Sequence, residues 1–357
     1  MTLLVTVLFV ALVFEFINGF HDTANSVAAV VGTKVLTPSQ AILLAAVMNL
    51  CGALAGTAVA TTVGKGLVDA NFVTNATILA ALSGATVWNL ITWRFGLPSS
   101  SSHALFGGLV GAAVASAGSW NVVIWSNPIP GKPWYTWGGL LYKVILPMFT
   151  SPMLGLVIGF CLTMVLYVSL SRLNPTGVNK VFRKLQVVSA AAMGFSHGSN
   201  DAQKTMGIVA LTLYSWTQSG ITSDLPSWLS FLRTPEFKIA LWIKIVCAIT
   251  MAAGTAAGGR RIIKTLGRKV TRLQPVNGFA ADLTSATVLL TTARLGMPVS
   301  TTHTVSASIM GVGAARNWRM TRWHLVESIA WAWVFTLPAS GLLAFGMMHL
   351  LKSLGAQ

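Results

Sequence analysis

Two short polar motifs each occur twice, at matching places in an otherwise apolar chain. Residues 19–25 (GFHDTAN) resemble residues 198–204 (GSNDAQK), which aligns Asp22 with Asp201. An ionised carboxylate inside a membrane is costly, so it usually faces a cavity, forms an ion pair, binds a cation or relays a proton. Two aspartates at equivalent places therefore predict a cation-coupling site. The alternative is that each aspartate caps a kinked helix or pairs with a buried lysine such as Lys204.

A glycine opens each copy of this motif. Because glycine adopts backbone conformations that other residues avoid, Gly19 and Gly198 predict a break in each helix. A broken helix frees backbone groups that can coordinate ions, as in many secondary transporters.

The second motif is a proline followed by small hydroxyl residues and a histidine. Residues 97–103 (LPSSSSH) resemble residues 297–303 (MPVSTTH). Pro98 and Pro298 fit the start of a helix, where free N–H groups and the positive end of the helix dipole favour an anion. The hydroxyls expected in the first turn are those of Ser101, Ser102, Ser300, Thr301 and Thr302. They predict a cradle for a tetrahedral oxyanion, unless they only bond back to the backbone and help helices pack.

An anion held beside two aspartates needs cations to offset the repulsion. Co-transported Na⁺ or H⁺ on the carboxylates meets this need, since each ligand then favours binding of the other. No resident cofactor is expected. Five further residues could support the site. They are Arg94 and Arg294 near the second motif, the acid Asp282, and His103 and His303, which we interpret as helix-stabilising hydrogen bonders, with proton carriers as the alternative.

The elements that position these motifs are membrane helices. Of 357 residues, 54% are hydrophobic and only 9% are charged, against about 25% charged in soluble domains. This composition excludes a soluble enzyme and a disordered chain. The formal charge of +16 would suggest nucleic acid in a soluble protein, but here the basic residues fall mainly between apolar segments, as in cytoplasmic loops. We therefore expect a lipid bilayer as the surroundings and no nucleic acid. The three cysteines predict neither a disulfide nor a metal site.

About ten apolar segments follow one another along the chain. They span residues 2–31, 40–64, 76–94, 102–125, 141–170, 186–213, 237–259, 278–294, 302–315 and 325–351. Several are shorter than the roughly 20 residues of a full crossing, which predicts re-entrant hairpins. Basic stretches at 172–184, 260–272 and 316–322 can all be cytoplasmic, which puts both termini on the other side.

The order of the motifs indicates a duplication. Five segments precede the second copy, and an odd number reverses its direction through the membrane. The sequence thus predicts an all-α polytopic membrane protein of two inverted repeats of about five segments each, with broken helices and re-entrant or short hairpins. Such proteins place their substrate near the midplane. The expected divisions are 1–125 (first repeat), 126–185 (connecting loop, long helix and basic linker), 186–315 (second repeat) and 316–357 (C-terminal helix).

The motifs GFHDTANSVA (19–28), GFSHGSNDAQKTMG (194–207) and MPVSTTHTVSASIMG (297–311) resemble signatures of the PiT-type inorganic phosphate transporters, in their bacterial branch. The resemblance covers essentially the whole chain. It implies a multi-pass carrier of the bacterial inner membrane, a homodimer in many members, that moves inorganic phosphate with Na⁺ or H⁺. It places Asp22, Asn25, Asn200 and Asp201 at the cation and phosphate site, with Thr23 beside them. The phosphate would be held by Ser101, Ser102, Ser300, Thr301 and Thr302.

The sequence departs from the wider family at three positions. His21 and Lys204 stand where many members have asparagine, and Asn49 stands where sodium-coupled eukaryotic relatives have glutamate. These departures resemble the branch associated with proton coupling. The sulfate-permease branch lacks the first aspartate, so Asp22 favours phosphate.

The sequence therefore predicts a cation-coupled phosphate symporter that works by alternating access. The alternative within transport is a sulfate or other oxyanion permease on the same scaffold. An enzyme is not expected, because neighbouring Ser and His on one helix do not face each other, and no hydrolase or nucleotide-binding motif is present.

Overall fold

The computed structural model describes residues 1–220, 226–258, 273–317 and 323–355. Within these ranges the chain is built from α-helices joined by loops and short helical turns, and no β-strand is formed. The helices are α1 (Thr2–Gly32), α2 (Pro38–Leu54), α3 (Ala58–Lys65), α4 (Asn75–Phe95), α5 (Ser101–Ala117), α6 (Leu146–Leu170), α7 (Pro175–Gln218), α8 (Leu241–Ala257), α10 (Pro275–Arg294), α11 (Thr301–Asn317) and α12 (Trp323–Ser353).

Apolar length supports a membrane-spanning bundle. Among the described residues, four helical stretches are long and apolar enough to cross a bilayer: α1, α4, α6 with its preceding turn, and α12 from Ile329 onward. Helices α2 and α3 together form a bent pair with an angle of 70° between them. The predicted all-α polytopic architecture is confirmed.

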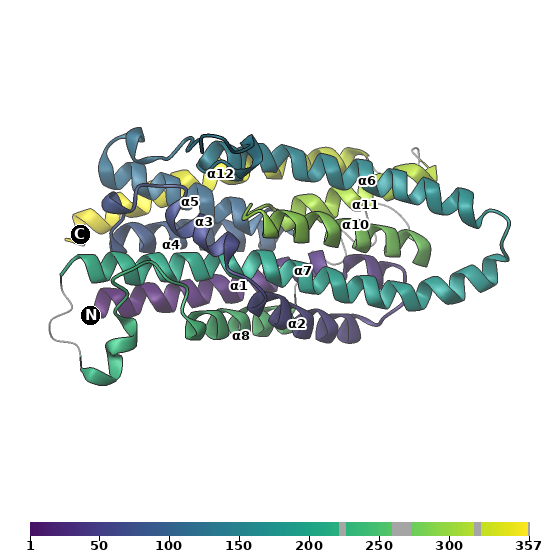
Figure 1. Cartoon of the computed structure of the whole chain (residues 1–357), viewed down its shortest axis with the longest axis horizontal. Helices are drawn as coiled ribbons and strands as arrows, with labels where there is room; N and C mark the ends of the chain where they lie inside the picture. Colours follow the sequence, from purple (N-terminus) through teal and green to yellow (C-terminus); the bar gives the residue numbers. More distant parts are fainter. Residues whose placement is uncertain (221–225, 259–272, 318–322, 356–357) are drawn as a thin grey trace.

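Two hairpins enter the bundle from opposite ends. Figure 1 shows α4 and α5 in the half that carries both termini, and α10 and α11 in the other half. Each hairpin turns at a left-handed glycine, Gly96 (φ 67°) or Gly296 (φ 63°). Their tips meet, since the rings of His103 and His303 lie 4.6 Å apart. The two predicted hairpins are thus confirmed.

Each hairpin is covered by the last helix of the other repeat. Helix α12 packs on α4 and α5, where a Cβ at Gly111 would lie 2.1 Å from the carbonyl oxygen of Gly341. Helix α6 packs on α10 and α11, where a Cβ at Gly311 would lie 2.1 Å from the carbonyl oxygen of Leu156. Gly111 and Gly311 are equivalent in the repeat, so both halves use a missing side chain to bring two helix backbones together.

The structure corrects two predictions about local geometry. Helices α1 and α7 run unbroken through Gly19 and Gly198. A Cβ at either glycine would lie within 2.4 Å of a carbonyl oxygen, of Met251 on α8 for Gly19 and of Asn49 on α2 for Gly198. These glycines therefore do not break α1 and α7. They allow the neighbouring helices α8 and α2 to pack closely against them.

The prolines of the second motif also lie outside the helices that they were expected to start. Helix α5 begins at Ser101 and α11 at Thr301, three residues after Pro98 and Pro298. Ser100 and Ser300 cap the two helices instead, each accepting a hydrogen bond from the backbone N–H three residues later, at 3.1 Å and 3.2 Å.

Two further sequence predictions are left open. The expected boundary between residues 185 and 186 falls inside α7, and the division of the chain into four parts stays a prediction. The basic residues at 260–272, together with Arg319 and Arg322, lie outside the described residues, so the orientation in the membrane also stays a prediction.

Close helix packing at the repeat-equivalent glycines predicts a stability cost for any side chain there. We expect Gly311→Ala to lower the free energy of unfolding by about 1–3 kcal/mol, because overpacking forces backbones apart. Gly346→Ala on α12 is the matched control, since a Cβ there meets no atom within 4 Å. Thermal unfolding of the two purified variants in detergent provides the comparison. Equal melting temperatures would contradict this account of the packing.

Candidate substrate and cation site

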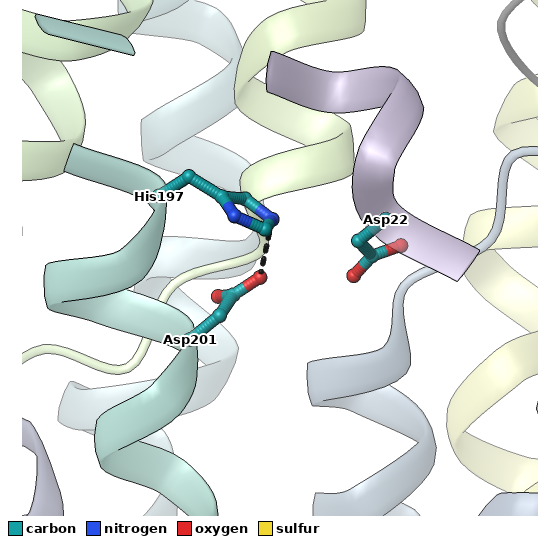
Figure 2. A group of neighbouring side chains, drawn as sticks. All are labelled: Asp22, His197 and Asp201. Atoms are coloured by element: carbon teal, nitrogen blue, oxygen red, sulfur yellow. Dashed lines mark ion pairs between the residues drawn. The ribbon is translucent and has the colours of Figure 1, made fainter. Parts of the chain in front are cut away.

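The two motif aspartates meet at the centre of the bundle. Asp22 lies on α1 and Asp201 on α7, and their side chains are 2% and 0% exposed. Together with His197 they offer ligand atoms that all lie within 4.8 Å of one another. Figure 2 shows the three side chains turned toward the same point between the two helices. The structure thus brings the expected pair of carboxylates together.

Asp201 is the more heavily bonded of the two acids. Its Oδ1 contacts the ammonium of Lys204, one turn further along α7. Its Oδ2 accepts a hydrogen bond from the Thr301 hydroxyl at 2.9 Å and lies 3.1 Å from His197 Nε2. His197 Nδ1 in turn lies 3.1 Å from Asn49 Oδ1 on α2. Asp201 is therefore held by residues of α7 and by the tip of the second hairpin.

Lys204 lies among oxygen atoms from three separate elements. Its ammonium contacts Asp201, the Ser102 hydroxyl at the start of α5, and the Val299 carbonyl just before α11, the last at 2.9 Å. The side chain is buried. Lys204 therefore supplies a fixed positive charge at Asp201 and ties both hairpin tips to α7.

Asp22 retains more free bonding capacity. Its Oδ1 lies 2.8 Å from His21 Nδ1 and 3.5 Å from the Thr302 hydroxyl, whereas its Oδ2 has no partner. His21 Nε2 lies 3.2 Å from the Thr92 hydroxyl of α4, which also accepts a hydrogen bond from Ser99. A polar chain thus runs from Asp22 into the first hairpin.

The two repeats make matching contacts with different residues. Asn25 on α1 donates to the hydroxyls of Thr302 at 2.9 Å and Thr301 at 3.4 Å, while Lys204 on α7 donates to Ser102. Asn25 is the repeat equivalent of Lys204, and Thr302 is the equivalent of Ser102. Helices α1 and α7 therefore each bind the hairpin tip of the other repeat. The contact is made by an amide group in α1 and by an ammonium group in α7.

Unpaired hydrogen-bond donors collect where the two hairpin tips face each other. The first backbone N–H groups of α5 and α11 have no partner within their own helices, because these are first-turn positions. The Ser101 hydroxyl at the start of α5 is buried without a partner, and so are the amide nitrogen and oxygen of Asn200, which precedes Asp201 on α7. Two facing positive helix ends repel each other unless an anion lies between them. The arrangement suits a small oxyanion.

Several predicted residues lie away from this cluster. Thr23 points to α8, since its hydroxyl bonds the carbonyl oxygens of Gly19 at 2.8 Å and Thr255 at 3.3 Å. Arg94 and Arg294 are exposed in the last turns of α4 and α10. Asp282 is buried against Gln186 and Ser189 of α7, twelve or more residues before Asp201. The structure does not bring these four side chains to the two aspartates.

The motif histidines make ring contacts with each other and with α12. The His103 and His303 rings meet edge to face, and His303 stacks on Trp333 of α12 at 4.1 Å. Both ring nitrogens of His303 lack a hydrogen-bond partner, and so does Nδ1 of His103. The interpretation as a helix-stabilising hydrogen bonder is therefore wrong for His303, and for His103 it stays a prediction. They are packing residues that join the two tips.

Two histidines that contact the aspartates were not predicted from the sequence. His197 lies four residues before Asp201 and therefore on the same helix face, a spacing that could have identified it. His21 was noted only as a departure from a family pattern, although it is the neighbour of Asp22 that reaches α4. The polar partner Asn49 was assigned no contact, because its bond to His197 joins positions 148 residues apart.

Comparisons with known proteins show the family of the chain. Residues 18–176 and 168–344 each match the profile of the phosphate transporter family, once for each repeat. This chain belongs to the phosphate transporter family. It is 43% identical over 343 residues to a protein of Rhizobium meliloti (strain 1021) named "probable low-affinity inorganic phosphate transporter", covering 96% of this chain and 94% of that protein. A protein of Bacillus subtilis (strain 168) with the same name is 41% identical, covering 98% of both chains.

A solved structure has the same fold. It is described as the sodium-dependent phosphate transporter, with a TM-score of 0.81 and 24% identity, over 99% of this chain and 100% of that one. At this identity the likeness speaks for the fold alone. The family and the named relatives make this chain a multi-pass membrane transporter and not an enzyme, as the sequence predicted.

The buried pair of Asp201 and Lys204 predicts a non-additive effect on stability. Lys204→Met leaves an unpaired carboxylate in the membrane interior, so we expect it to cost about 3–5 kcal/mol. The double variant Asp201→Asn, Lys204→Met removes both charges and should recover most of that loss. Unfolding of the two single variants and the double variant in detergent measures the coupling. Additive losses would show that the two side chains do not stabilise each other.

Proposed function

We propose that this chain is a cation-coupled symporter that carries inorganic phosphate across a bacterial cytoplasmic membrane by alternating access. The observation that carries the proposal is the meeting of two hairpin tips, rich in hydroxyl groups, at two buried aspartates. The transported cation is H⁺ or Na⁺, and no resident cofactor is needed. The family of the chain and the names of its relatives support phosphate as the substrate.

Phosphate binding rests on donors at the two tips and on the neighbouring part of α7. Ser101, with its unpartnered hydroxyl, and Asn200, with its unpartnered amide, have hydrogen bonds to give. The hydroxyls of Ser102, Thr301 and Thr302 now bind Lys204 and the two carboxylates, and they would turn to the phosphate once a cation occupies the carboxylates. Ser300 acts mainly as a helix cap, and Thr23 supports the α1–α8 contact, so we assign neither to phosphate.

Coupling follows from the charges of the site. Two carboxylate groups with oxygen atoms within 4.8 Å of each other repel by at least about 3 kcal/mol at an effective dielectric constant of about 20, and a phosphate adds to this. Lys204 compensates Asp201, which leaves Asp22 with a free oxygen and without a lysine or arginine in contact among the described residues. A cation bound at Asp22 would complete the compensation. Anion and cation therefore each favour the binding of the other.

Alternating access follows from the burial of the site. None of the cluster side chains named above is more than 5% exposed, so this conformation is closed toward both ends of the bundle. Substrate can enter only if packing loosens around one hairpin while the other stays shut. The two hairpins open to opposite ends, so loosening α4–α5 and loosening α10–α11 would expose the same cluster to opposite sides.

Removing either carboxylate charge should uncouple the carrier. We expect Asp22→Asn and Asp201→Asn each to abolish concentrative phosphate uptake into proteoliposomes, because the cation loses its ligand. Glu236→Gln is the control, since it removes the charge of an exposed acid in the loop before α8. Uptake at the wild-type level in both aspartate variants would disprove this part of the proposal.

The substrate itself is tested by uptake of radiolabelled phosphate into proteoliposomes under a Na⁺ gradient or a pH gradient, applied in turn. We expect one of the two gradients to drive accumulation, and arsenate to compete better than sulfate. Sulfate accumulation without phosphate accumulation would assign the chain to another oxyanion. Uptake that is indifferent to both gradients would make it a uniporter.

A further inference from the structure

A third acidic side chain in the membrane interior lies outside the central cluster. Glu15 is 0% exposed on α1, seven residues before Asp22. Seven residues make about two turns, or roughly 10 Å along the axis, so both side chains lie on the same side of the helix. Glu15 is therefore placed between the cluster and the end of the bundle that carries both termini (Figure 1).

The carboxyl group of Glu15 is bonded on one oxygen only. Its Oε2 accepts from the Thr205 hydroxyl of α7 and from the Asn18 amide, the latter at 3.5 Å. Its Oε1 is buried and has no partner. This pattern leaves Oε1 available to carry a proton while Oε2 accepts hydrogen bonds.

The charges around Glu15 do not compensate an ionised form. The titratable groups that face it are Asp201 and Lys204 on α7 and Cys247 on α8. Lys204 is already in contact with Asp201, and Asp201 would repel a second negative charge. Among the described residues no ion pair includes Glu15. A lone carboxylate in a membrane is costly, so the surroundings favour a bound proton.

Glu15 is also linked to the part of α7 that holds the substrate site. Thr205, its hydrogen-bond donor, directly follows Lys204 in the chain, and the contact joins the two repeats. An ionised Glu15 would add a negative charge near Asp201 and oppose an incoming anion, whereas a protonated one would not.

We propose that Glu15 binds a co-transported proton, separately from the aspartate pair, and so makes phosphate uptake respond to pH. The proposal rests on the phosphate symport proposed above. Its site comprises Glu15, Thr205 and Asn18, at the contact of α1 with α7. The proton carried in with phosphate would leave when the site opens to the other side.

The test compares net accumulation with exchange in proteoliposomes. A gradient of one pH unit supports at most about a tenfold accumulation of phosphate for each proton carried. We expect Glu15→Gln to lose this accumulation and yet to exchange labelled for unlabelled phosphate when the pH is equal on both sides, because exchange moves no net proton. Exchange by the variant should also become independent of pH between 5 and 8.

Two matched variants separate proton binding from packing. Glu15→Asp keeps a carboxyl group and should retain accumulation driven by the pH gradient, and Glu236→Gln should behave as the wild type. Thr205→Val removes a donor that favours the ionised form of Glu15. The proton should then be held more tightly, and half-maximal uptake should move to a higher external pH. This shift can be measured even if Glu15→Gln does not fold.

Three results would overturn the proposal. The first is accumulation by Glu15→Gln on a pH gradient at the wild-type level. The second is a folded Glu15→Gln variant that has lost both exchange and accumulation. The third is accumulation by the wild type that is driven by Na⁺ alone. Wild-type protein that neither exchanges nor accumulates phosphate would instead refute the symport on which the proposal rests.

Discussion

Two carboxylate groups forced close together in a membrane interior set the requirements for the rest of this molecule. Asp22 and Asp201 come from helices that run through the bundle in opposite senses, and neither is exposed to water. Their repulsion and lost hydration must be offset by nearby positive charge and hydrogen-bond donors. Lys204, the two neighbouring histidines and the hydroxyl groups of the hairpin tips supply this compensation. A substrate anion fits only if a further positive charge arrives with it.

The inverted repeat is symmetric in its backbone and asymmetric in its charges. Both long helices reach a hairpin tip from the same repeat position, but that residue is Asn25 in one half and Lys204 in the other. Glu15 has no acidic counterpart, because the equivalent position in the second repeat is Gly194. Alternating access requires two similar halves, while coupling requires that their charges differ.

The sequence was sufficient to predict the helices, the duplication, the two hairpins and the pair of aspartates, because apolar length and repeated motifs are local signals. It was not sufficient for the contacts that depend on packing. Gly19 and Gly198 predicted helix breaks, but the neighbouring helix backbones make them packing positions. Thr23 follows Asp22 directly, yet a rotation of about 100° per residue turns it to α8. The bond between Lys204 and Ser102 joins residues 102 positions apart, a pairing that no pattern along the chain specifies.

The exchange of covering helices between the repeats determines when the chain can finish folding. The hairpin of α4 and α5 is complete early in synthesis, but α12, which covers it, is synthesised after the other described helices. Trp88 of α4 finds its hydrogen-bond partner in Thr336, and the carbonyl oxygens of Ala115 and Ser116 find theirs in Lys352. Before α12 is inserted, one face of the first hairpin is in contact with lipid. A chain truncated before α12 would therefore lose the cover of its first half, although every residue of that half is present.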